Sequence, residues 1–91
     1  MIYTLDFTAS AERDIAFLKK YDSHSYKKLE RLLAELIEHP ATGTGKPEPL
    51  KGNRSGQWSR RISKKHRLIY KIREEIVTVL ILSSYGHYDD K

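Results

Sequence analysis

The sequence contains no cysteine, which excludes disulfide bonds, thiolate nucleophiles and cysteine-ligated zinc. It also lacks a long apolar run. The longest apolar stretch, Ile76 to Leu82, is interrupted by Thr78 and falls far short of the roughly 20 residues that cross a bilayer. The first residues carry no basic cluster and meet an acid at Asp6, unlike a secretory signal. We therefore expect a soluble, cytoplasmic protein that does not contact membranes.

Glycine and proline are scarce and unevenly placed. All three prolines and four of the five glycines lie between His39 and Gly56. These residue types favour turns and interrupt helices and strands, so this segment is predicted to form a loop or short irregular turns. Long loops in small domains are often functional.

Length and charge limit the possible functions. The 91 residues are enough for one domain, residues 1–91, because typical domains have roughly 100 to 150 residues. The net charge of +5 and the pI near 9.5 favour an anionic partner such as nucleic acid. The segment from Gly43 to Arg73 holds ten Lys and Arg and one acid, Glu48, so it carries +9 while the remainder carries −4. This segregation indicates a nucleic-acid-binding surface.

Two helices are predicted in the first half of the chain. Thr8 is a suitable N-cap for the first helix, which runs for about three turns with acids early and lysines late. Asp22 or Ser23 caps the second helix, and Pro40 ends it. Apolar residues at helical spacing mark one face of each helix, which we expect to face the core.

Four strands are predicted around these helices, with a hairpin turn at Glu74–Glu75 between the last two. They cover residues 2–8, 58–62, 67–72 and 76–82. The element order β-α-α-β-β-β predicts an α+β fold in which two helices pack on one face of a mainly antiparallel four-stranded sheet.

The four histidines do not have the spacing of metal ligands, so no metal site and no cofactor are predicted. His66 lies between two cations, which would repel a metal ion. The pair His87–Tyr88 follows the last predicted strand. Considered alone, it is either an ordinary end of a sheet or a catalytic histidine with a stacking tyrosine.

Glu48 is the only acid in the basic segment and lies between Pro47 and Pro49. The two prolines restrict the local backbone, so the carboxylate can be held in one direction at little entropic cost. A proton acceptor in a basic, nucleic-acid-binding environment is one interpretation. An ion pair with Lys46 or Lys51 is the other.

Three arginines, Arg60, Arg61 and Arg67, alternate with apolar residues along two neighbouring predicted strands. Because side chains of a strand alternate between faces, one face can pack on the helices while the other presents guanidinium groups to phosphate. Alternatively, some of these arginines only solvate the sheet. Trp58 is expected in the core rather than on a base-stacking surface.

Several motifs together resemble the YoeB/Txe family of toxins from type II toxin-antitoxin modules, within the RelE/ParE superfamily. The resemblance is specific from about residue 43 to 88. It rests on the motifs GKPEPLK (45–51), SG (55–56), WSRRI (58–62), HRLIY (66–70) and HY (87–88). The element order predicted above agrees with the RelE/ParE fold.

The resemblance implies a ribosome-dependent endoribonuclease that cuts mRNA in the ribosomal A site without a metal. It further implies a cognate YefM/Axe-like antitoxin whose C-terminal segment covers the active surface, and a possible homodimer. By matching position it assigns Glu48 as general base, Arg67 as the phosphate contact in the transition state, His87 as general acid and Tyr88 as a residue that orients it or stacks on a base. The RNA-binding positions it implies, together with two basic neighbours, are Lys46, Lys51, Arg60 and Arg61.

The sequence departs from this family at two places. Lys65 stands where many relatives have a glutamate, and Asp89 to Lys91 extend past the His-Tyr pair that ends some relatives. A second hypothesis also remains open: a non-cleaving RNA- or ribosome-binding module, or a superfamily relative that inhibits a topoisomerase. Glu48 and the His87–Tyr88 pair distinguish the two, because binding alone does not require them.

Overall fold

The computed structural model describes residues 2–84, so the predicted site residues His87 and Tyr88 lie outside the described part of the chain. Within it, the elements follow in the order β1 (Thr4–Phe7), α1 (Ala9–Tyr21), α2 (Ser23–Leu36), β2 (Glu48–Pro49), a short 3₁₀ helix (Gly52–Arg54), β3 (Trp58–Arg61), β4 (His66–Arg73) and β5 (Ile76–Ser84).

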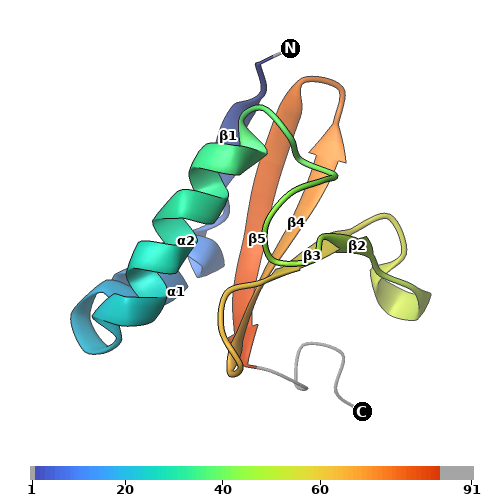
Figure 1. Ribbon diagram of the computed structural model, residues 1–91. Helices are drawn as coiled ribbons and strands as arrows, with labels where there is room; N and C mark the ends of the chain where they lie inside the picture. The colour runs from blue at the N-terminus through green and yellow to red at the C-terminus, as the bar shows by residue number, and fades with distance from the viewer. Residues whose placement is uncertain (1, 85–91) are drawn as a thin grey trace.

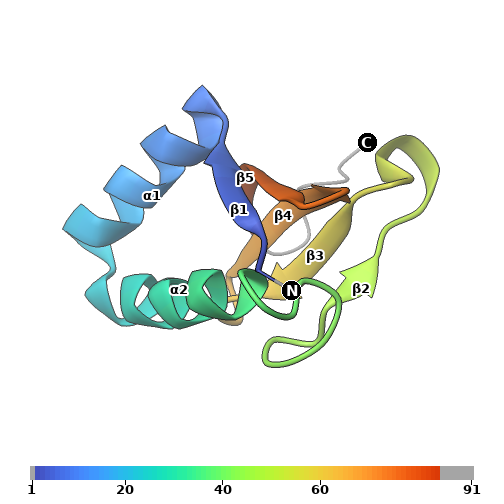
Figure 2. The same cartoon turned by 90° about the horizontal axis from the view of Figure 1, so that it is seen from above.

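The strands form one five-stranded sheet with the order β1-β5-β4-β3-β2. β1 runs parallel to β5, and the other neighbours are antiparallel. Both helices cover the same face of this sheet (Figures 1 and 2). The predicted α+β class, with two helices on one face of a mainly antiparallel sheet, is therefore confirmed.

The predicted strand count of four is wrong by one, because the proline-rich loop contains β2. There, Glu48 and Pro49 pair with Ser59 and Trp58. A proline is tolerated at this position because β2 is an edge strand, where a missing N–H leaves no gap inside the sheet. β2 has only two residues, too few to show the alternation of apolar and polar residues by which a strand is recognised in a sequence.

Both predicted helix caps are present. The Thr8 hydroxyl accepts a hydrogen bond from the Ala11 amide at 3.0 Å, and the Asp22 carboxylate accepts one from the Ser25 amide at 3.1 Å. The second helix ends at Leu36, four residues before Pro40. Its last turn instead closes through backbone bonds that Glu38 and His39 donate to the Glu35 carbonyl.

The core lies between the helices and the sheet. Trp58 is half-buried and packs against it, as predicted. The members of this core cluster that are 0% exposed come from α1, from α2 and from the helix-facing side of β4 and β5: Ala11, Leu29, Leu32, Leu36, Leu68, Tyr70, Val77 and Val79. Within residues 2–84, no helix combines the length and apolar character needed to cross a membrane.

Candidate active site

The face of the sheet that points away from α1 and α2, which we term the outer face, gathers three of the predicted site residues. Arg61 pairs with Arg67 across β3 and β4, and Glu48 pairs with Ser59 across β2 and β3. Side chains opposite each other in a ladder point to the same face, and neighbours along a strand alternate. Because Leu68 belongs to the core, Arg67 beside it lies on the outer face with Arg61 and Glu48.

The register also sets the spacing on this face. Glu48 is opposite Ser59, and Arg61 follows two residues later on β3, so Glu48 and Arg61 are diagonal neighbours about 7–8 Å apart. Glu48 and Arg61 are exposed, and Arg67 is half-buried. One carboxylate and two guanidinium groups therefore share a small area that a phosphodiester could span.

The end of β5 lies beside Arg67. Ser83 pairs with Arg67 and Ser84 pairs with His66. His87 follows three residues after Ser84 in the sequence, outside the described residues. The predicted phosphate contact, Arg67, thus lies opposite the end of the strand that precedes His87 in the sequence.

Two predicted RNA-binding lysines flank β2. Lys46 precedes it with a positive φ of 52°, and Lys51 follows it as the N-cap of the 3₁₀ helix. Both are exposed. Within residues 2–84 the carboxylate of Glu48 forms no ion pair with either lysine, so the simple ion-pair interpretation is not supported.

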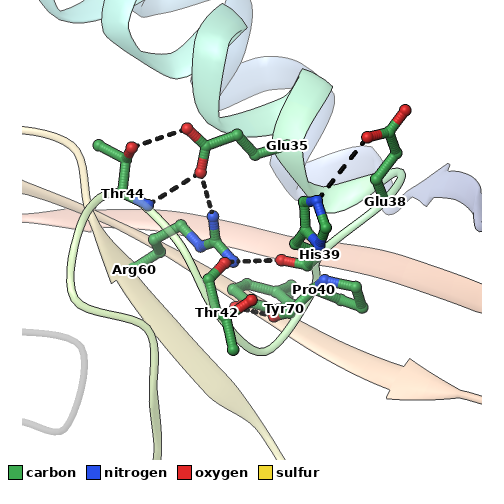
Figure 3. A network of polar contacts seen from close by, with 8 residues as sticks. All are labelled: Glu35, Glu38, His39, Pro40, Thr42, Thr44, Arg60 and Tyr70. Atoms are coloured by element: carbon green, nitrogen blue, oxygen red, sulfur yellow. Dashed lines mark hydrogen bonds and ion pairs between the residues drawn. The ribbon is translucent and has the colours of Figure 1, made fainter.

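Arg60 does not lie on this surface, and the prediction that it contacts RNA is wrong. Its side chain is 0% exposed because Arg60 is opposite Leu68 in the ladder and therefore faces α2. Its guanidinium donates to the Glu35 carboxylate at 3.0 Å and to two backbone carbonyls, of His39 and Thr42, at 2.8 Å each (Figure 3). The sequence already indicated this burial. Arg60 lies two residues from each of the apolar residues Trp58 and Ile62, and residues two apart on a strand point to the same face.

Glu35, which sequence reasoning missed, connects this buried arginine to the loop. Its carboxylate accepts hydrogen bonds from the Thr44 hydroxyl at 2.7 Å and from the Thr44 amide at 2.9 Å. The Thr44 hydroxyl is the main cause that holds the pKa of Glu35 below its ordinary value of 4.5. Partial burial opposes this, while the Thr44 amide and the positive charge of Arg60 reinforce it.

The lowered pKa of Glu35 predicts a pH-dependent contribution to stability. A carboxyl group with a depressed pKa in the folded protein stabilises it above the unfolded pKa, near 4.5, and loses that contribution as the pH falls through the folded value. We expect the wild type to exceed Glu35→Gln in free energy of unfolding at pH 7, with the gap shrinking below about pH 4.5. Urea unfolding of both proteins between pH 3 and 7 measures it, and a gap independent of pH would contradict this role.

His66 lies close to another acid, with its Nε2 3.7 Å from the Asp22 carboxylate. The pKa of Asp22 is lowered, first by the hydrogen bond from the Ser25 amide and then by the Ser25 hydroxyl, with a smaller contribution from His66. In the described range 2–84, no group of three or more His, Asp or Glu side chains is arranged to hold a metal ion.

Solved structures of known toxins share this fold. The "YoeB/ParE toxin from Agrobacterium tumefaciens" superposes with a TM-score of 0.84 at 33% identity, over 90% of this chain and 98% of that one. A YoeB dimer from Staphylococcus aureus superposes with 0.82 at 31% identity, over 96% and 100%. YoeB in its complex with YefM, from the same organism, superposes with 0.80 at 30% identity, over 91% and 97%. These likenesses place the chain in a class of bacterial toxins with a RelE-like α+β fold.

The sequence narrows the class to a family. Residues 7–88 match the model of the YoeB-like toxin of bacterial type II toxin-antitoxin systems. Toxin YoeB of Streptomyces coelicolor is 39% identical over 84 residues, which cover 92% of this chain and 98% of that protein. The chain therefore belongs to the YoeB-like toxin family, and the resemblance seen in the sequence is confirmed.

Proposed function

We propose that this toxin is a ribosome-dependent endoribonuclease that cuts mRNA in the ribosomal A site, in the cytoplasm. The observation that carries the proposal is the register of the outer face, which places Glu48 diagonally from the Arg61–Arg67 pair. A carboxylate and paired guanidinium groups at this spacing are suited to cleaving a phosphodiester. The carboxylate can remove a proton, and the guanidinium groups can stabilise negative charge on the phosphate.

The reaction needs no metal. Glu48 removes the proton of the ribose 2′-OH, and the 2′-oxygen attacks the adjacent phosphorus. The bond from phosphorus to the 5′-oxygen breaks, and His87 gives its proton to that oxygen. Arg67 balances the charge that develops on the phosphoryl oxygens. The products are a 2′,3′-cyclic phosphate and a 5′-hydroxyl, and DNA, which has no 2′-OH, is inert.

The remaining predicted residues hold the RNA. Lys46 and Lys51 are exposed on either side of β2, and Arg61 lies between Glu48 and Arg67 in the register. Cations at these positions can bind successive phosphates of one strand. Tyr88 orients His87 or stacks on a base.

The same positive surface suits an inhibitory partner. An antitoxin of the YefM/Axe type, with an acidic C-terminal segment that folds on binding, would cover the outer face and neutralise it. The Staphylococcus aureus relative was solved with YefM, which supports such a partner here. The dimer of that relative supports a homodimer.

The test is to map the 5′ ends of mRNA after brief induction of the toxin in cells. We expect new ends within codons of translated messages, at positions that disappear when the start codon is removed. If growth stops while messages stay intact, the binding-module or topoisomerase hypothesis replaces this one.

A further inference from the structure

The loop between α2 and β2 is fixed to the rest of the protein by buried groups rather than by its own secondary structure. Arg60 donates to the carbonyls of His39 and Thr42 near its start, and Glu35 binds the amide and hydroxyl of Thr44. One residue later, the Gly45 carbonyl accepts from the Arg61 amide at 2.6 Å. Figure 3 shows the Arg60 guanidinium between the α2 carboxylate and the loop carbonyls.

Stability alone does not explain why a charge is placed here. The Arg60 side chain is 0% exposed, whereas that of Glu35 is 32% exposed. Removing a guanidinium from water is costly, and well-packed apolar residues often serve a core equally well. An arginine offers something an apolar residue cannot: a rigid fork that fixes several acceptors in one plane. Here those acceptors are a carboxylate and two loop carbonyls.

The β2–β3 ladder that holds Glu48 is short. β2 has two residues, Glu48 and Pro49, and just beyond them the Leu50 amide donates to the Gln57 carbonyl at 2.8 Å. Before Glu48, the next backbone bond to β3 is the one that the Gly45 carbonyl accepts from the Arg61 amide. The position of Glu48 therefore depends in part on where the preceding loop is held, and Gly45 is only three residues away.

We propose that Arg60 and Glu35 form a positioning pair that holds the loop of residues 39–45, so that Glu48 stays in register with Arg61 and Arg67. Neither residue of the pair touches RNA. The catalytic part of this inference rests on the proposed function, and the placement of the loop does not. Arg60 thus positions the loop from the helix side of the sheet, whereas Arg61 and Arg67 contact the RNA on the outer face.

A matched pair of threonine variants tests the proposal without removing the buried charge. Thr44→Val deletes the hydroxyl bonded to Glu35 at 2.7 Å and keeps the side-chain shape. Thr42→Val makes the same chemical change two residues earlier, where only the backbone carbonyl is bonded to Arg60. We expect Thr44→Val to lower the first-order cleavage rate at saturating ribosomes by about 10- to 100-fold with an unchanged half-saturating concentration. Thr42→Val should match the wild type.

A pair of glycine variants tests the close approach of the loop to β3. Gly45 and Gly56 have similar left-handed φ values, +87° and +92°, so alanine strains both backbones alike. A Cβ at Gly45 would lie 2.7 Å from the Arg60 Cγ and 2.8 Å from the Arg61 carbonyl, whereas at Gly56 it meets nothing within 4 Å. Gly45→Ala should therefore lose cleavage rate by a similar factor to Thr44→Val, and Gly56→Ala should not.

Amide hydrogen exchange, followed by NMR on the purified proteins, separates this proposal from the proposed function. In Thr44→Val and Gly45→Ala the amides of Thr44 and Arg61 should exchange faster, while amides of the β4–β5 ladder stay as in the wild type.

If exchange at the amides of Thr44 and Arg61 is unchanged, the pair does not hold the loop and the proposal is overturned. If exchange rises but cleavage stays at the wild-type rate, the loop is held for another purpose and the catalytic part is overturned. A wild type that cuts no RNA refutes the proposed function instead, and with it that catalytic part, while the exchange result still decides the placement of the loop.

Discussion

Arg67→Ala is expected to lower the rate of mRNA cleavage on the ribosome by about 10²- to 10³-fold, the usual cost of removing a donor that stabilises transition-state charge. Arg67 lies on the outer face opposite Arg61 and beside the end of β5, where a developing phosphoryl charge would meet its guanidinium. Arg67→Lys should recover only part of the loss, because a point charge cannot bind two phosphoryl oxygens in one plane. Single-turnover cleavage of mRNA on programmed ribosomes measures both.

The control for Arg67 is Arg73, on the same strand and with the same parity. Six residues of strand separate them by about 20 Å, so Arg73→Ala removes an equal charge from the same face without reaching the reacting phosphate. We expect Arg73→Ala to cleave at the wild-type rate. If Arg67→Ala and Arg73→Ala lower the cleavage rate equally, only the overall positive charge matters and Arg67 has no specific role in the transition state.

Glu48→Gln is expected to lower the cleavage rate by about 10²- to 10⁴-fold, since the amide keeps the shape of the carboxylate but cannot accept the 2′-OH proton. Binding to the ribosome should persist, because the cations that flank β2 and those on β3 and β4 are untouched. Glu74→Gln, an equal change at an exposed acid in the β4–β5 turn, is the matched control. Cleavage by Glu48→Gln at the wild-type rate would remove Glu48 from the mechanism.

Most of the secondary structure was predictable because it depends on local chemistry. The Thr8 and Asp22 caps, the Glu74–Glu75 turn and the three strands that follow the loop are encoded by short-range patterns, and the structure places each of them within a few residues. β2 was not predictable, because its two residues form a strand only through pairing with β3.

The candidate site was predictable where it rests on strand parity or on family motifs, and not where it rests on tertiary contacts. The outer-face positions of Arg61 and Arg67 follow from the ladder. The burial of Arg60 follows from the same alternation and was misassigned because a basic residue in a basic segment suggests a surface. The bond between Glu35 and Thr44 joins the last turn of a helix to a loop nine residues away, and no local pattern predicts it.

Lys65 is the position at which the sequence is expected to depart from many members of the family. It is exposed in the β3–β4 turn, next to the half-buried His66 and two residues from Arg67. A cation there makes the approach to Arg67 more positive than a glutamate would.

Metal-free attack by the 2′-OH is tested by the chemical ends of mRNA that the purified wild-type protein cuts on ribosomes. We expect one cut per message in the A-site codon, with a 2′,3′-cyclic phosphate on the upstream fragment and a 5′-hydroxyl on the downstream fragment. A message that stays intact while translation stops, or fragments that carry 5′-phosphates and 3′-hydroxyls, would contradict metal-free attack by the 2′-OH with Glu48 as its base.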